Sequence, residues 1–450
     1  MNKNNPVQQR MNIFLVEWTA IINRPNIKVV RIHTKENDLD MVDAYYEFMT
    51  AVDTNQEDFV VIFESKFNTL EIYGSDLVKE LQEQVDMWNS AQKPPEYDDS
   101  DVDWQADYTI GKHHNVAELF ARNLNTFANY ISPHKDIKVS LVLRMHFIDK
   151  KNAYIWLNDL MKCHLEPHII IAVNDTHEYP LHQKIADQYP KEVFTVAPDF
   201  DTDKVLEELA ASGDPAAPET PFRTNMIKLM KAVKDRAADR VQHHAKKCLT
   251  IAFKQVKKDP LWISQIVGIY TILYSDQIGY KDFEKAIFFA QKANESALLT
   301  ENLIDPGLSY RLIGQTHLGL GALYFNTKKF GDALSNYEKA AYAYANCQDF
   351  LMQCESLRQC GIAGKKSQGK SIALDYFLKA YQLKPNLKGD MVKNSSFPFV
   401  VKELLKYRQL KDHISPAQMD RDMTPVFGED WQTVIKKYGK APNVHQFETE

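Results

Sequence analysis

Apolar residues in the first half of the chain follow two alternating patterns. Short continuous apolar runs predict buried strands, and longer stretches with apolar residues every three or four positions predict helices. The predicted strands are 27–32, 59–63, 137–143, 168–173 and 193–196, and the predicted helices are 14–22, 39–52, 77–88, 116–131, 152–161, 181–189 and 204–210. Because such strands alternate with helices, we expect residues 1–210 to form an α/β domain whose mostly parallel sheet is covered on both faces.

A segment with three prolines and one glycine, residues 211–221, ends this pattern. Such a composition cannot continue a helix, so we predict an interdomain linker there. Beyond the linker, apolar residues recur every three or four positions over residues 222–258. This spacing predicts one long helix with a buried stripe.

The other face of that predicted helix is basic, and its candidates for partner binding are Lys228, Lys231, Arg240 and Lys247. A solvated Lys-rich face is the plain interpretation; docking of an acidic protein surface or of a nucleic acid is the alternative. Few aromatic residues interleave with these charges, which argues against stacking on single-stranded nucleic acid. An acidic protein surface is the better partner, and the chain's own acidic segment 94–104 is one candidate.

Residues 314–347 read as two helices joined by a short turn, with small and large residues at fixed positions. The first helix carries His317, Leu320, Gly321 and Tyr324, and the second carries Ala333, Tyr337, Ala340 and Ala345. We expect the small residues Gly321 and Ala333 to let the two helices approach closely, while the tyrosines fill the space beside them.

Two further copies of this unit align with the first. The following copy has Leu357, Gly361, Ala373, Phe377, Ala380 and Pro385 at the corresponding positions, and the preceding copy has Tyr270, Leu273, Ala286 and Ala293. Each copy departs once from the pattern: Gly364 replaces a tyrosine in the later copy, and Tyr274 replaces the glycine in the earlier one.

These units resemble the tetratricopeptide repeat over some 120 residues. The resemblance implies an all-α repeat domain over residues 222–390, capped by helices within residues 391–450. It also implies a concave groove, lined by the first helix of each unit, that binds peptides or protein segments. The groove candidates are Arg311, Gln315, Asn326, Gln353 and Arg358, although some of these side chains could serve only to keep the stack in solution.

The order of strands and helices in the first half, followed by helical repeats, is similar to that of signal-transducing P-loop ATPases that carry repeat domains. The resemblance covers residues 10–300 and implies a phosphate loop after the first strand. Residues 33–38 contain no glycine there and add acidic side chains. A backbone cradle for phosphate needs glycine and exposed N–H groups, so the resemblance implies a degenerate, non-hydrolysing domain.

A phosphate-loop pattern does occur elsewhere, in residues 364–371. Gly364, Gly369, Lys370 and Ser371 satisfy G-x-x-x-x-G-K-S letter for letter. The mechanism of that motif needs a strand before it and a helix after it. Because residues 351–361 are helical in the repeat register, we expect this segment to be the turn between two repeat helices, with at most a weak anion contact at the start of the second.

The remaining polar clusters make poor metal sites. Asp99, Asp101 and Asp103 imitate the start of a calcium loop, but Trp104 and Ile110 stand where that loop needs glycine and a bidentate glutamate. Cys163, His164, His168, His177 and His182 lack the spacing of zinc ligands. The sequence therefore predicts no metal and no cofactor.

Asp175 is the one candidate for catalysis, because it follows a strand, where open α/β sheets place active residues. No nucleophile–base pair accompanies it, so we predict no catalytic residue.

The composition of the chain indicates where the protein is located more than what it does. The chain has 450 residues, a net charge of -6 and a 44% hydrophobic share, with no apolar run of transmembrane length and a polar N-terminus unlike a secretory signal. Its five cysteines form no paired framework, which indicates reduced thiols in a cytoplasm. Oligomeric state is left open.

The sequence predicts a non-catalytic cytoplasmic scaffold, adaptor or chaperone that binds a protein or peptide client through the repeat groove. The alternative is a nucleotide-responsive signalling regulator that uses residues 364–371 or a hidden site in the α/β domain. A third hypothesis is an enzyme with Asp175 in a cleft at the strand ends. Whether residues 364–371 follow a strand separates the first two.

Overall fold

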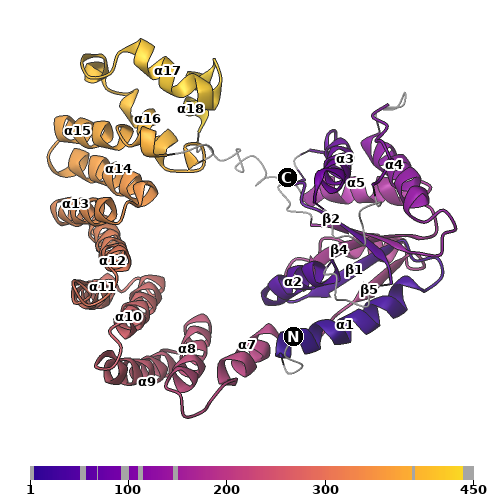
Figure 1. Cartoon of the computed structure of the whole chain (residues 1–450), viewed down its shortest axis with the longest axis horizontal. Coiled ribbons are helices and arrows are strands. Elements are labelled where there is room, and N and C mark those ends of the chain that lie inside the picture. The colour runs from indigo at the N-terminus through magenta and orange to yellow at the C-terminus, as the bar shows by residue number, and fades with distance from the viewer. Residues whose placement is uncertain are drawn as a thin grey trace, which may run out of the picture. The chain divides into compact units, whose positions relative to one another are not determined.

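The structure is a computed structural model of the chain that describes residues 5–50, 57–67, 69–92, 101–109, 115–144, 150–387 and 391–438. The chain divides into two compact units, residues 1–209 and 210–450 (Figure 1). The first contains a parallel sheet with helices, and every regular element described in the second is a helix, so the predicted fold class is confirmed. None of the described helices has the length and apolar character needed to span a membrane.

Five parallel strands form the sheet of the first unit, in the order β2-β3-β4-β1-β5. The strands are β1 (Val29–Thr34), β2 (Phe59–Phe63), β3 (Val139–Leu143), β4 (Ile169–Thr176) and β5 (Val193–Val196). All five predicted strands are present, with ends shifted by at most three residues. The match follows from their apolar runs, since β1, β3 and β4 are buried along nearly their whole length.

Helices cover both faces of this sheet. Side chains of Val30 and Ile32 pack on one face with Phe14 and Trp18, whereas alternate strand residues such as Ile171 face the opposite layer. The first layer contains α1 (Pro6–Ile22) and α2 (Leu39–Met49). The second contains α3 (Tyr73–Ser90), α4 (Val116–Ile131), α5 (Lys150–Lys162) and α6 (Gln183–Gln188).

After β1 and β4, which are neighbouring strands, the chain continues to opposite faces of the sheet. The helix after β1 is α2, which packs on one face, and the helix after β4 is α6, whose Ile185 packs on the other. In open α/β sheets, ligands bind in the crevice between neighbouring strands whose helices leave to opposite faces. This edge of the sheet is therefore the first place to look for a site. The unit ends at α7 (Thr202–Ala211).

The second unit is a stack of four helix hairpins followed by shorter helices (Figure 1). The hairpins are α8 (Glu219–Lys234) with α9 (Ala238–Val256), α10 (Trp262–Gly279) with α11 (Phe283–Leu298), α12 (Pro306–Asn326) with α13 (Phe330–Asn346), and α14 (Phe350–Ser367) with α15 (Lys370–Tyr381). The prediction of one long helix over residues 222–258 is wrong. The chain reverses at Arg236, whose φ of 52° ends α8 and begins a hairpin.

A repeated polar contact relates the first hairpin to the third. His317 Nδ1 lies 3.0 Å from Asn336 Oδ1 in α12 and α13, and His244 Nδ1 lies 3.2 Å from Asn225 Oδ1 in α8 and α9. The partners are 19 residues apart in both cases, with the histidine and the asparagine exchanged. The α8/α9 hairpin thus shares a polar contact between its two helices with the α12/α13 hairpin.

Close packing inside the last two hairpins depends on glycine. A Cβ atom on Gly321 would lie 2.5 Å from the Tyr337 ring, and one on Gly361 would lie 2.5 Å from the Phe377 ring. Both distances are far below van der Waals contact, so no larger residue fits without movement of the ring. The predicted role of Gly321 in close helix approach is confirmed.

In the first two hairpins, the large and the small residue of this pair are exchanged between the two helices. The large residue lies on the first helix, as Leu229 or Tyr274, and an alanine lies sixteen residues later, as Ala245 or Ala290. Each pair belongs to one packed cluster. The departure at Tyr274 is therefore compensated by a small partner on the facing helix.

Three short helices follow the hairpins: α16 (Phe397–Leu404), α17 (Pro416–Phe427) and α18 (Trp431–Lys437). Trp431 and Ile435 of α18 are buried in one cluster with Phe377 of α15. The Trp431 ring nitrogen donates a hydrogen bond to Asp420 at 2.9 Å. These helices cover the last hairpin, as expected for a capping segment, since its apolar side would otherwise be exposed.

Candidate functional site

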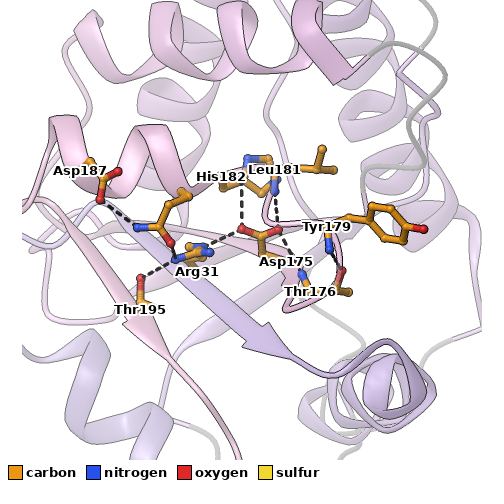
Figure 2. Close-up of polar contacts among 9 residues, drawn as sticks. Arg31, Asp175, Thr176, Tyr179, Leu181, His182, Asp187 and Thr195 are labelled. Carbon is orange, nitrogen blue, oxygen red and sulfur yellow. Dashed lines mark hydrogen bonds and ion pairs between the residues drawn. The ribbon is translucent and has the colours of Figure 1, made fainter.

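A buried ion pair occupies the sheet edge between β1 and β4 (Figure 2). Arg31 of β1 and Asp175 of β4 are joined at 2.7 Å between Nε and Oδ2, and their side chains are 2% and 0% exposed. Arg31 Nη1 also donates to Gln183 Oε1 at 2.9 Å. A buried charge is tolerated only when it is paired in this way, so the two residues depend on one another.

Every direction around the Asp175 carboxylate is occupied by the chain itself. Oδ1 accepts hydrogen bonds from the backbone N–H groups of Thr176 and Leu181, at 3.1 and 2.7 Å. Oδ2 accepts from Arg31 and from the backbone N–H of His182 at 3.0 Å (Figure 2). Asp175 thus holds the loop after β4 against β1, and its buried oxygens offer no lone pair to a substrate.

Histidines beside this ion pair are shifted toward the neutral form. Burial lowers the pKa of His182 to about 4, with Asp175 opposing the shift and Arg31 adding to it. Burial also lowers the pKa of His33, helped by the nearby charges of Arg31 and His177. The His33 and His177 rings are 4.1 Å apart between centroids. Burial thus favours the neutral form of His182 and His33 at the sheet edge.

The place of a phosphate loop, directly after β1, is occupied by the chain's own carboxylates. The backbone N–H of Glu36 donates to Glu178 Oε2 at 3.0 Å. Asp38 is buried and accepts hydrogen bonds from the Thr202 N–H at 2.9 Å and from the Thr202 hydroxyl at 2.6 Å. A phosphate there would meet negative charge in place of exposed N–H donors.

The phosphate-loop pattern at residues 364–371 lies on helices. Gly364 belongs to α14, and its carbonyl accepts hydrogen bonds from the N–H groups of Gln368 and Gly369 at 2.8 and 3.0 Å. Gly369 has a φ of 107° and precedes Lys370 and Ser371 in the first turn of α15. The segment follows a helix and not a strand, so the context that the motif requires is missing.

The predicted groove residues fall into two groups. Arg311, Gln315 and Asn326 are exposed on α12. Gln353 is half-buried on α14. The structure therefore places three of the five candidates where an incoming chain could reach them.

Arg358 is held by its own neighbours. Its Nε and Nη2 donate to the two Glu355 carboxylate oxygens, both at 2.7 Å. Ser396, at the start of α16, also donates to Glu355, at 2.5 Å. Burial opposes the ionisation of Glu355, but the Arg358 partner lowers the pKa of that carboxyl below its usual range. Glu355 thus links α14 to the start of α16, and its ion pair with Arg358 occupies the guanidinium that a client would need.

The predicted basic helix is divided between the two helices of the first hairpin. Lys228 and Lys231 lie on α8, and Arg240 and Lys247 lie on α9. Burial lowers the pKa of His244, and the charges of His243, Lys247, Lys228 and Arg240 lower it further. Three of the four candidates therefore share one positive region around His244, whereas Lys231 is half-buried.

The other sequence candidates do not form a metal site. Among the described residues, no three acidic, histidine or cysteine side chains are placed to hold a metal ion. Asp99 and Ile110 lie outside the described residues. Trp104 is buried against α4 and donates to the Thr126 hydroxyl at 3.1 Å, whereas Asp101 and Asp103 are exposed.

Sequence reasoning missed a hollow beside the start of α15. Its lining combines lysines near residues 365–371 with basic residues near 406–413, which lie about forty residues later. A count of charges within one helix gives no sign of this cluster, because the two stretches meet only in the fold. No family model matches the chain, and no curated protein is similar to it.

Proposed function

We propose that the chain is a non-catalytic, cytoplasmic protein-binding scaffold, adaptor or chaperone, whose tetratricopeptide-like repeats hold a segment of a client protein. The observation that carries the proposal is the nearly uncharged solvent face of α10 and α12. These two helices contain 18 and 21 residues, and their only charged side chains are Asp276, which is buried, and Arg311. Both helices lie on the inner side of the arc that the hairpins make (Figure 1).

The exposed positions of α12 form one stripe. Arg311, Gln315, Ala322 and Asn326 are exposed and follow helical spacing, with half-buried Leu318 between them. On α10 the exposed residues include Ser275 and Ile278. Such a stripe offers amide and hydroxyl hydrogen bonds beside small apolar contacts, which suits a neutral protein segment.

In the two middle hairpins, the second helices differ sharply from α10 and α12. α11 carries Glu284, Lys285, Lys292 and Glu295, and α13 carries Asp332, Glu338 and Lys339. If surface charge served only to keep the protein in solution, both sides of the stack would carry such charges. The contrast supports a client that docks on the inner face and is itself poor in charge.

The nucleotide-responsive alternative has less support. It needs either a phosphate loop after a strand or an open site at the sheet edge. Residues 364–371 span the end of α14 and the first turn of α15, and the ends of β1 and β4 are filled by Arg31 and Asp175. The cytoplasmic location rests on the cysteines, all five of which are free thiols.

Peptide selection tests the proposal. Random peptides displayed on phage are selected on the immobilised full chain, and the enriched peptides are measured by fluorescence anisotropy. Ala322→Glu places a charge and bulk on the inner stripe and should weaken binding by about tenfold or more. Ala345→Glu makes the same change at an exposed site on α13 and should leave affinity unchanged. Failure to enrich any peptide, or equal losses in both variants, would argue against the groove.

A further inference from the structure

A cavity of about 570 Å³ lies where the end of α14, the start of α15 and the segment after α16 meet. Lys365 and Lys370 line it from the two hairpin helices, and Lys406, Arg408 and His413 line it from the capping segment. The cavity therefore joins cationic side chains from three elements of the fold. Its size is within the range typical of small-molecule sites.

Positive charge in this cavity is poorly neutralised by the chain. In the part of the chain that the structure describes, Lys365, Lys370 and Arg408 form no ion pair, and all three are exposed. Lys406 pairs with Glu403. Asp375 is the carboxylate in the lining. The lining thus attracts anions, although the whole chain carries a net charge of -6.

Backbone donors add to this charge. α15 begins at Lys370, and no side chain caps its N-terminus. The preceding Gly369 has a φ of 107° and leaves open space where a side chain would lie. The first N–H groups of a helix need acceptors from outside it, and the helix dipole favours a negative one. Ser371 lines the cavity from the same turn and supplies a hydroxyl.

A buried hydroxyl in the lining also lacks a partner. Tyr407 lines the cavity and is only 9% exposed, yet its hydroxyl makes no hydrogen bond to any described residue. Its ring is fixed against Phe377, with the centroids 6.2 Å apart. A buried polar atom without a partner is costly, so the wall of the cavity contains a hydroxyl whose hydrogen bond the described residues do not supply.

We propose that this cavity binds an anion with two or more phosphate groups, either as a free polyphosphate or as part of a nucleotide. A single phosphate would reach only part of a cavity of about 570 Å³, whereas a phosphate chain can contact Lys365, Lys370 and Arg408 together. The mode of binding differs from that of a phosphate loop, since Gly364 stays within α14 and no strand is involved. It is independent of the client groove.

Calorimetry on the full chain tests the site, with tripolyphosphate as the probe and a chelator present to remove divalent cations. Wild type should bind, and Lys370→Gln or Arg408→Gln should each weaken binding by about tenfold or more, the effect of losing one charge-assisted hydrogen bond.

Lys366→Gln is the matched control against Lys365→Gln. Both lysines are exposed neighbours on α14, but only Lys365 lines the cavity. If ATP binds more tightly than tripolyphosphate, the ligand is a nucleotide. If the two affinities are equal, the site recognises the phosphate chain alone.

Two results would overturn the site. One is the absence of binding at low salt, where electrostatic attraction is strongest. The other is an equal loss of affinity in Lys366→Gln and Lys365→Gln, which would show diffuse attraction to a basic surface. Circular dichroism of each variant verifies that the helices remain folded.

Discussion

The sheet edge and the repeat stack reach their structures by opposite means. At the sheet edge, a charged pair 144 residues apart in sequence is buried, and Asp175 alone accepts four hydrogen bonds. In the repeat stack, neighbouring helices fit because a glycine or an alanine faces a large residue, as at Gly321 and Tyr337. One region is held by paired charge and the other by complementary volume.

This difference explains where each region is open. The crevice between β1 and β4 would be the natural ligand site of the fold, but a paired charge fills it. Packing by volume takes place between the helices and leaves the solvent-facing stripes of α10 and α12 exposed. The crevice between β1 and β4 is therefore filled by the chain itself, whereas α10 and α12 of the helical unit keep exposed residues along one side.

Removing Asp175 should have the largest effect. Asp175→Ala leaves the buried Arg31 charge without its partner and should destabilise the α/β unit by about 3–5 kcal/mol. Four of the six tryptophans, at positions 18, 88, 104 and 156, belong to this unit. Urea unfolding followed by tryptophan fluorescence therefore measures the loss, with Asp187→Ala, an exposed carboxylate on α6, as the control. A stable Asp175→Ala protein would contradict the structural role and reopen the question of catalysis.

Acid should weaken the same region. The pKa of His182 is about 4 in the folded chain, below the ordinary value of 6.5, because burial disfavours the charged form. The unfolded chain thus takes up a proton first as the pH falls below 6.5. Stability is complete above that pH and should decrease by about 2 kcal/mol at pH 5, continuing to fall until pH 4.

Two variants isolate this histidine from the other titrating groups. His182→Gln should flatten the fall of the unfolding free energy between pH 7 and 5. His164→Gln replaces a histidine whose side chain is 79% exposed and should leave the slope as in wild type. Equal slopes in all three proteins would show that His182 does not titrate abnormally.

In the repeat stack the sharpest test adds a single methyl group. Gly321→Ala forces a Cβ atom against the Tyr337 ring and should cost about 2 kcal/mol in thermal or urea unfolding followed at 222 nm. Gly331→Ala is the control, because a Cβ there meets nothing within 4 Å. Its effect should be neutral or slightly stabilising.

The exchange of large and small residues between hairpins suggests a double variant that restores the packing between positions 321 and 337. Gly321→Leu with Tyr337→Ala reproduces the arrangement of Leu229 and Ala245 in the first hairpin. The double variant should be at least about 1 kcal/mol more stable than the sum of the single changes predicts. Additive losses would mean that the two sites do not share one packing volume.

Periodicity was sufficient to predict most of the architecture. In the described part of the α/β unit, the five strands and the seven helices were each expected from spacing, although α1 begins eight residues before its predicted start at residue 14. The α8/α9 hairpin was missed since no glycine or proline marks its turn; Arg236 takes the left-handed conformation there. Tyr274 looked like a defect until its small partner, Ala290, was considered on the facing helix.

The candidate sites were harder to predict, because their residues meet only in the fold. Arg31 and Asp175 lie on neighbouring strands that are far apart in sequence, and no local pattern pairs them. Arg358 looked free for a client but is bound by Glu355, within reach of Ser396 from the capping segment. Exposure and charge partners depend on such long-range contacts, which a single sequence does not show.

The smallest expected effect concerns the turns of the repeat stack. Arg236, Lys281 and Lys328 end the first helix of three hairpins with φ values of 52°, 59° and 61°. A side chain in this left-handed region is strained, so Lys328→Gly should stabilise the helical unit by about 0.5–1 kcal/mol. Lys329→Gly changes the next residue, whose φ is -83°, and should give no gain. If both variants behaved alike in thermal unfolding, the turn would not be strained. A gain limited to position 328 would show that backbone shape, like side-chain volume, sets the stability of this region without any buried charge.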